Sequence, residues 1–261
     1  MLLRHLLDRI DVCAPLGCAE PWDNVGLLLG RDDAHVRRAL LTIDLTDAVL
    51  QEAQALSADL VIAYHPPWFG AKKRLVGDDI ILTAARSNLS IFSPHTALDA
   101  AHGGTNDVLA DAAGMCPQGR QALSALRAPH PHALGMGRVG SLPTPQAFGP
   151  WLEALKGAMG LRHALVAGQT AADVAQVAVC AGAGDALWEQ ALAAGADTFV
   201  VGELRHHHAL AAAAQKMRVV ALLHSASERA ALAPYARKLR HLAPDVTFHV
   251  STTDADPYSF E

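Results

Sequence analysis

The chain has 261 residues, of which 51% are hydrophobic and 18% are charged, and its formal net charge at pH 7 is -5. This length and composition suffice for one large or two ordinary globular domains with buried cores. The negative charge, with no basic run longer than Lys72-Lys73-Arg74, argues against nucleic acid and against an anionic membrane surface as partners.

The predicted elements alternate between helices and short strands along the chain. Helical spacing of apolar residues predicts helices over residues 2–12, 46–56, 78–87, 105–113, 146–159, 184–194, 203–216 and 225–241. Apolar runs predict strands over residues 27–29, 39–44, 59–63, 89–92, 164–167, 174–180, 197–201, 219–223 and 246–250. Such alternation is typical of an α/β fold with mostly parallel sheets.

Two related α/β lobes are expected. Shifting the chain on itself by 138 residues aligns 46–65 with 184–203 without a gap, with six identities in twenty positions. Between residues 117 and 150 six prolines interrupt the pattern, so the lobes are predicted at 1–125 and 126–261. The segment from about residue 220 is expected to pack back on the first lobe and to complete a metal site in the cleft between the lobes.

The segment Gly135-Met136-Gly137-Arg138-Val139-Gly140 matches the dinucleotide fingerprint G-x-G-x-x-G. The fingerprint binds pyrophosphate only where a strand precedes it and a helix begins within it, whereas prolines flank this copy on both sides. We therefore expect no nicotinamide cofactor.

The four cysteines, at positions 13, 18, 116 and 180, form no C-x-x-C pair and are predicted to be buried free thiols. The N-terminal residues 1–9 are amphipathic and resemble neither a secretion signal nor a membrane span, which predicts a cytoplasmic protein. Histidine is abundant: its 14 copies outnumber Phe (6), Trp (4) and Tyr (3) taken together. Imidazole is a common ligand of transition metals.

Four polar segments directly follow predicted strands: His65, His95–Asp99, Glu203–His208 and His224–Glu228. In open α/β sheets, ligands bind outside the carboxyl ends of the strands. Each segment alone has a more ordinary explanation, such as a turn histidine at position 65 or an i, i+4 helix pair formed by His224 and Glu228. The coincidence of four such segments favours a metal centre. Near the first strand, Trp22 with Asp23 and Asn24 either line a pocket or simply form a turn.

A donor set of histidine and carboxylate suits zinc, iron, manganese or nickel and does not distinguish among them. Asp99 can use both carboxylate oxygens and could bridge two ions about 3.5 to 4 Å apart, an arrangement that activates water for hydrolysis. Glu203, His206, His207 and His208 are expected to support the metal ligands or to contact a substrate.

The motifs in this order resemble the Nif-three-like family, often described as GTP cyclohydrolase I type 2 homologues. The motifs are residues 21–27, 64–67, 95–99, 103–107, 135–140, 202–207 and 224–228, which together span almost the whole chain. The resemblance implies two related lobes, a dinuclear metal centre held by His65, Asp99, His224 and Glu228, and a toroidal homohexamer. Many bacterial members have His-His-Pro where this chain has Tyr64-His65-Pro66, so one metal loses an imidazole here. Tyr64 either binds that metal through its phenol or packs facing away from it.

We therefore expect one or two divalent transition metals per chain and, as the first hypothesis, a metal-dependent hydrolase of a nucleotide-like small molecule. Besides Tyr64, His95 is expected to lie near the ligands or a substrate. The alternative hypothesis is a non-catalytic hexameric metal-binding scaffold or metal-handling protein. Its motive is the lack of a phosphate-binding loop or of an obvious set of purine-stacking aromatic residues in a chain with 5% aromatic content.

Overall fold

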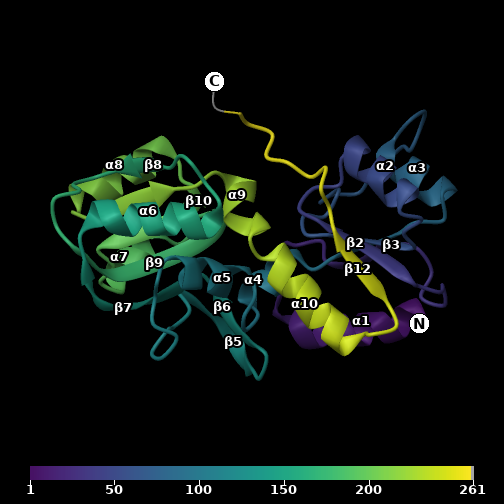
Figure 1. Ribbon diagram of the computed structural model, residues 1–261, viewed down its shortest axis with the longest axis horizontal. Helices are drawn as coiled ribbons and strands as arrows, with labels where there is room; N and C mark the ends of the chain where they lie inside the picture. Colours follow the sequence, from purple (N-terminus) through teal and green to yellow (C-terminus); the bar gives the residue numbers. More distant parts are fainter. Residues whose placement is uncertain (260–261) are drawn as a thin grey trace. The chain divides into compact units, whose positions relative to one another are not determined.

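The structure is a computed structural model that describes residues 1–259 (Figure 1). The chain forms two compact units. Unit 1 comprises Met1–Leu98 and the described residues from Leu232 onward, and unit 2 comprises Asp99–Ala231. Within the described residues, no helix combines the length and the apolar character needed to cross a membrane.

Unit 1 is built on a five-stranded sheet with helices on both faces. The strands, in spatial order, are β1 (Gly26–Leu29), β4 (Ser90–Ser93), β3 (Leu60–Ala63), β2 (Arg38–Thr42) and β12 (Thr247–Val250). The four strands from β4 to β12 pair in parallel, and β1 is antiparallel to β4. The helices are α1 (Leu3–Cys13), the short 3-10 helix η1 (Leu16–Cys18), α2 (Asp47–Ala55), α3 (Ile80–Arg86), the start of α4 (His95–Ala100), and α10 (Leu232–Leu242).

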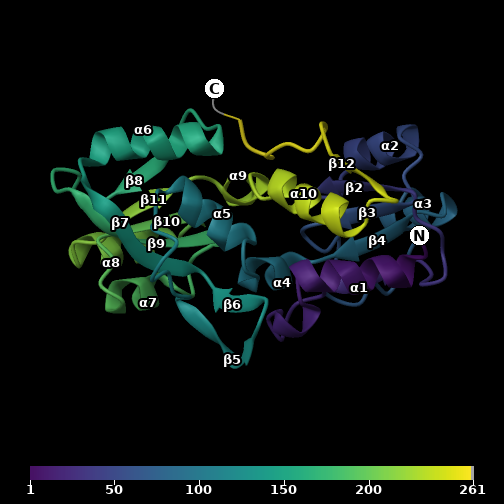
Figure 2. The same ribbon diagram turned by 60° about the horizontal axis from the view of Figure 1, so that its bottom comes forward.

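Alternate residues of the unit 1 strands enter two separate cores. Leu41 and Ile62 pack with α1 and α10, which lie side by side, whereas Leu40 and Val61 pack with α2 and α3 (Figures 1 and 2). Because successive side chains of a strand point to opposite faces, fully apolar strands such as β3 belong in a sheet that is covered on both sides.

Unit 2 repeats this architecture. Its sheet has the order β7 (Arg138–Gln146), β9 (Val174–Ala183), β10 (Thr198–Glu203), β11 (Arg218–Ala221) and β8 (Leu165–Ala167), with β9, β10 and β11 parallel and both edges antiparallel. Its helices are α5 (Thr105–Ala112), α6 (Phe148–Met159), α7 (Trp188–Ala193), α8 (His206–Ala214) and α9 (His224–Arg229). A hairpin of β5 (Ser124–His130) and β6 (Ala133–Met136) completes the unit (Figure 2).

The strand register confirms the internal repeat. In unit 1 Ala39 pairs with Leu60, and in unit 2 Val177 pairs with Thr198, so both partners are displaced by the same 138 residues. The carboxylate of Asp59 accepts hydrogen bonds from the backbone N–H groups of residues 37 and 38, and that of Asp197 accepts them from the equivalent residues 175 and 176. The prediction of two related α/β lobes with mostly parallel sheets is confirmed.

The division between the units differs from the boundary predicted at residues 125/126. Helix α5 packs against β9 and β7, so residues 99–125 belong to the second unit. The C-terminal strand β12 pairs in parallel with β2, and therefore the chain from Leu232 belongs to the first unit. The predicted helix 225–241 is interrupted and forms α9 and α10.

The proline-rich stretch that was predicted to be a junction forms strands instead. Pro129 lies in β5, and Pro143 and Pro145 lie in β7, which is an edge strand of its sheet. Proline lacks the N–H that an interior strand must donate, but an edge strand tolerates this loss. The register of β7 shifts between Ser141 and Gln146, around these prolines. The segment 135–140 runs from β6 into β7 without a helix, so the fingerprint lacks the context for binding pyrophosphate.

Candidate functional site

His65 follows the end of β3 in unit 1, as predicted. Its imidazole Nδ1 lies 2.9 Å from Oδ1 of Asp44, which follows the neighbouring parallel strand β2. A carboxylate only accepts hydrogen bonds, so Nδ1 carries the proton and the lone pair resides on Nε2. Metal-binding histidines in proteins are commonly oriented by a carboxylate in this way.

His95 lies next to His65, and four rings surround it. Its ring centroid is 5.3 Å from that of His65 and 5.5 Å from that of Tyr64, with nearly perpendicular planes. Trp22 and Phe69 approach the same imidazole at 6.0 and 5.8 Å. The Tyr64 ring is 2% exposed and belongs to the apolar core of unit 1.

The Nδ1 atom of His95 lies 2.8 Å from Oδ1 of Asp23, a carboxylate whose side chain is fully buried. Burial alone would raise the pKa of Asp23, but the hydrogen bonds from His95 and Thr96 outweigh it and lower that pKa below its ordinary value. Asp23 therefore stays ionised and fixes the tautomer of His95. The segment after Glu20 is a turn, which confirms one of its two interpretations, and its Asp23 side chain contacts His95.

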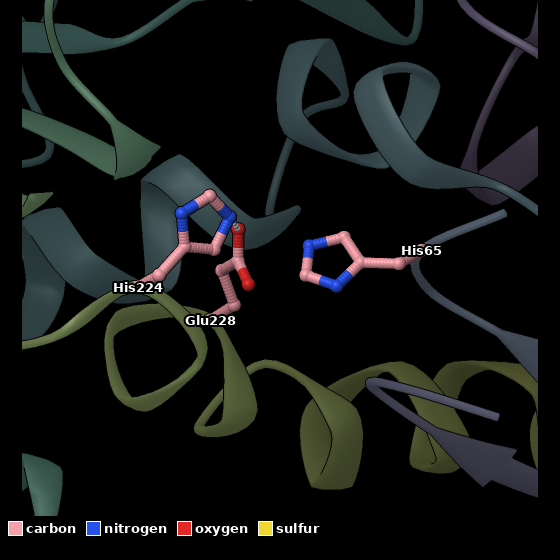
Figure 3. Close-up of side chains that lie close together, drawn as sticks. All are labelled: His65, His224 and Glu228. Atoms are coloured by element: carbon pink, nitrogen blue, oxygen red, sulfur yellow. Dashed lines mark ion pairs between the residues drawn. The ribbon is translucent and has the colours of Figure 1, made fainter. Parts of the chain in front are cut away.

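In unit 2, the His224 imidazole lies between two carboxylates, Glu203 and Glu228, of which Figure 3 shows Glu228. His224 begins α9, and its Nδ1 lies 3.0 Å from Oε1 of Glu203, the last residue of β10. Its Nε2 lies 3.3 Å from Oε1 of Glu228, one turn further along α9. Glu228 is 2% exposed. The predicted i, i+4 arrangement of His224 and Glu228 therefore exists on one helix face.

Gly182 provides the space beside this pair. It has a φ of +67°, and a Cβ added there would lie 2.6 Å from Oε1 of Glu228 and 3.2 Å from Nε2 of His224. Its N–H donates to Oγ of Ser227, which in turn donates to the carbonyl of His224. Glycine is thus required at this position both by its backbone conformation and by the two donor atoms.

Asp99 lies near the end of α4 and is 5% exposed. The thiol of Cys180, a buried residue of β9, has its pKa raised by burial and further by the carboxylates of Asp99 and Glu228. Both carboxylates therefore lie close enough to the Cys180 thiol to act on it electrostatically. Because its pKa is raised, Cys180 remains a neutral thiol. The prediction of four buried thiols is wrong in part, since all four are free but Cys18 and Cys116 are only half-buried.

His206 and His207 begin helix α8 at exposed positions. The ring of His207 contacts His208, whose Nδ1 lies 2.8 Å from Oδ1 of Asp185. Glu203 contacts His224, as expected of a residue that supports a ligand, whereas within the described part of the chain neither His206 nor His207 bonds to a candidate ligand.

The sequence analysis missed Asp44 and Gly182. Asp44 lies two residues beyond the end of β2, as His65 lies two residues beyond the end of β3, so the rule that selected His65 by its position at a strand end would also have found it. Gly182 occupies the position equivalent to Asp44 in the 138-residue self-alignment. Its role became visible only from the atoms that a Cβ would meet.

The model of the family Duf34/NIF3 (NGG1p interacting factor 3) matches residues 1–257. The chain belongs to this family. The Clostridium perfringens protein named GTP cyclohydrolase 1 type 2 homolog is 26% identical to this chain over 265 residues, and the match covers 100% of both chains. The Schizosaccharomyces pombe protein NIF3 homolog is 34% identical over 92% of this chain and 91% of its own length. A solved structure of a Bacillus cereus protein related to NIF3 has a TM-score of 0.92 at 22% identity, over 100% of this chain and 99% of that one, and shows the same fold.

The donor atoms of this Duf34/NIF3 chain fit a divalent transition metal. Two ligands bound about 2.0–2.1 Å from one tetrahedral ion lie roughly 3.3 Å from each other. The atoms His224 Nε2 and Glu228 Oε1 have that separation, 3.3 Å. Imidazole and carboxylate without thiolate match zinc, iron, manganese and nickel.

Proposed function

We propose that this Duf34/NIF3 chain binds one or two divalent transition metals through His65, Asp99, His224 and Glu228 and acts as a metal-dependent hydrolase. The observation that carries the proposal is the arrangement of the two imidazoles. In His65 and in His224, Nδ1 lies within hydrogen-bonding distance of a carboxylate that orients the ring, and Nε2 of His224 lies 3.3 Å from an oxygen of a second carboxylate, Glu228. A histidine with only a packing role does not need a charged partner that fixes its tautomer.

The residues of the chain have separate tasks in this proposal. Asp44 and Glu203 hold the protons on the Nδ1 atoms and keep the rings in place, while the almost fully buried Glu228 supplies negative charge. When bound, a divalent metal lowers the pKa of water and so supplies a nucleophile near neutral pH. The burial of Tyr64 in the core of unit 1 supports packing rather than metal binding through its phenol. We therefore propose that any second metal binds more weakly.

The substrate class in this proposal is a nucleotide-like small molecule. Relatives in Clostridium perfringens and Streptomyces coelicolor are named GTP cyclohydrolase 1 type 2 homolog, and those names make GTP the first compound to test. The free thiols suit a reducing compartment, so we place the protein in the cytoplasm. We also propose a homohexamer, on the resemblance described above.

Elemental analysis of the purified protein, together with GTP hydrolysis before and after removal of the metal, tests the proposal. We expect a stoichiometric transition metal, loss of turnover on stripping and recovery on reloading. His224→Ala and Glu228→Gln should abolish metal retention, whereas His241→Ala, a control at an exposed histidine of α10, should retain it. A metal-free protein, or equal retention by His224→Ala, would refute metal binding.

The alternative, a non-catalytic hexameric metal-binding scaffold, makes a different prediction for the same samples. Metal retention and a hexamer in light scattering, without turnover of GTP or of other nucleotides and phosphoesters, would reject the hydrolase and favour the scaffold. The original motive for the scaffold, the lack of an aromatic set, is weakened because the fold gathers Trp22 and Phe69 beside His95.

A further inference from the structure

Two large aromatic side chains lie together on the surface of unit 1, although burial is their ordinary preference. Trp22 is 62% exposed and Phe69 is 56% exposed, and their ring centroids are 6.2 Å apart with an interplanar angle of 41°. Fully burying a large apolar side chain of this kind stabilises a protein. Leaving two adjacent rings exposed forgoes this stabilisation, which is typical of a binding surface.

A role in covering His95 does not account for the exposure of these rings. His95 is 9% exposed, and Tyr64 and His65 contact its ring in addition to Trp22 and Phe69. Trp22 and Phe69 meet its imidazole edge to face, with interplanar angles of 76° and 65°. More than half of the surface of each residue therefore remains available to another molecule.

The segments that carry the two rings are fixed before any ligand arrives. The side-chain amide of Asn24 donates to the carbonyl of Trp68 over 2.7 Å, which ties the turn containing Trp22 to the segment containing Phe69. The backbone N–H of Glu20 donates to Oγ1 of Thr96. The buried Asp23 carboxylate accepts from Thr96 and pairs with His95. A preorganised aromatic surface loses little conformational entropy on binding.

We propose that Trp22 and Phe69 form a stacking site for the planar heteroaromatic ring of a nucleoside-class substrate. This inference rests on the proposed function, because the aromatic pair surrounds His95, whose ring contacts the proposed metal ligand His65. Stacking on aromatic side chains suits any nucleobase, because every base has a π-face, and it requires no particular pattern of hydrogen bonds. The site therefore recognises the class of the substrate rather than the identity of the base.

Guanosine is the probe, because it carries the aromatic ring but no phosphate that could bind a metal directly. Isothermal titration of metal-stripped protein with guanosine, and with ribose as the compound lacking the ring, isolates the stacking contribution. Trp22→Leu removes the π-face but keeps an apolar side chain, and Trp22→Phe restores a ring. Tyr258→Leu is the matched control, since Tyr258 is 74% exposed and lies outside the cluster.

We expect Trp22→Leu and Phe69→Leu each to weaken guanosine binding roughly 5- to 150-fold, which corresponds to 1–3 kcal/mol for a stacked base. Trp22→Phe should stay within a few-fold of the wild type, Tyr258→Leu should not differ from it, and ribose should show no binding. Failure of the wild type to bind guanosine at millimolar concentration overturns the proposal. Equal affinity in Trp22→Leu overturns it as well. Circular dichroism of each variant verifies that it is folded.

Different outcomes would refute the proposed stacking site and the proposed hydrolase activity. Guanosine binding that depends on Trp22, in a protein whose metal-loaded form leaves GTP intact, rejects the hydrolase and keeps the stacking site. Metal-dependent GTP hydrolysis with an unchanged KM in Trp22→Leu rejects the stacking site and keeps the hydrolase.

Discussion

Replacing Gly182 with alanine tests whether the donor atoms of unit 2 act as metal ligands. The new Cβ would lie 2.6 Å from Oε1 of Glu228 and 3.2 Å from Nε2 of His224, and side-chain carbons do not approach other heavy atoms as closely as the first of these distances. The carboxylate must therefore move away, and the imidazole must shift slightly. Disturbing the groups that position a metal ligand typically lowers metal affinity 10- to 100-fold, so we expect a loss of roughly that size or larger.

Gly195→Ala supplies the matched control. Gly195 has a φ of +80°, close to the +67° of Gly182, but a Cβ at Gly195 would meet no atom within 4 Å. Both alanines occupy a left-handed backbone conformation, which costs about 1–2 kcal/mol and lowers the melting temperature by about 2–4 °C per kcal/mol in a chain of this size. The difference between the two variants isolates the effect on His224 and Glu228.

Competition with a chromogenic zinc chelator gives the metal affinity, and thermal unfolding of the stripped proteins gives the stability. We expect Gly195→Ala to lose stability but to retain the affinity of the wild type. Gly182→Ala should lose at least as much stability and, in addition, its affinity. Equal zinc affinity in the two variants would refute the assignment of His224 and Glu228 as ligands.

Three further predictions concern individual carboxylates. Glu203→Ala, at an exposed residue, should lower zinc affinity roughly 10- to 100-fold without unfolding the protein, because His224 loses the acceptor for its Nδ1 proton; chelator competition measures this. The pKa of Glu52 falls from 4.5 to about 2, since burial is outweighed by hydrogen bonds from residues 251–253. Its stabilising contribution is thus complete above pH 4.5 and is lost as the pH falls through 2, and urea unfolding should show the advantage over Glu52→Gln shrinking in that range. Asp59→Asn and Asp197→Asn should each lower stability by about 1–3 kcal/mol in urea unfolding, because each carboxylate accepts two backbone N–H groups at equivalent positions; a cost confined to one unit would contradict their equivalence.

Most strands of the parallel sheets could be predicted from the sequence because they are short, apolar and bounded by turn residues. The segments after Asp59 and Asp197 show this, and their helices and strands coincide with the predicted repeat. The strands between residues 124 and 146 could not be predicted, because proline interrupts the alternation on which the prediction depends and is tolerated only through an edge position that the sequence does not reveal. Likewise, the pairing of β12 with β2 joins segments more than 200 residues apart, and no local pattern specifies that partner.

The sequence indicates that carboxylates lie near the strand ends that carry the histidines, but it does not indicate which carboxylate bonds to which imidazole. In unit 1 the residue after β2 holds the histidine after β3, whereas in unit 2 the last residue of β10 holds the histidine after β11. The carboxylate–imidazole pair is thus shifted by one strand between the units. As a result, the self-alignment places Asp44 opposite Gly182 and His65 opposite Glu203. Sequence comparison of the lobes therefore finds no shared residue at the position where the shared chemistry lies. This displacement also explains the glycine at position 182. A side chain there, equivalent to that of Asp44, would occupy the space next to Glu228.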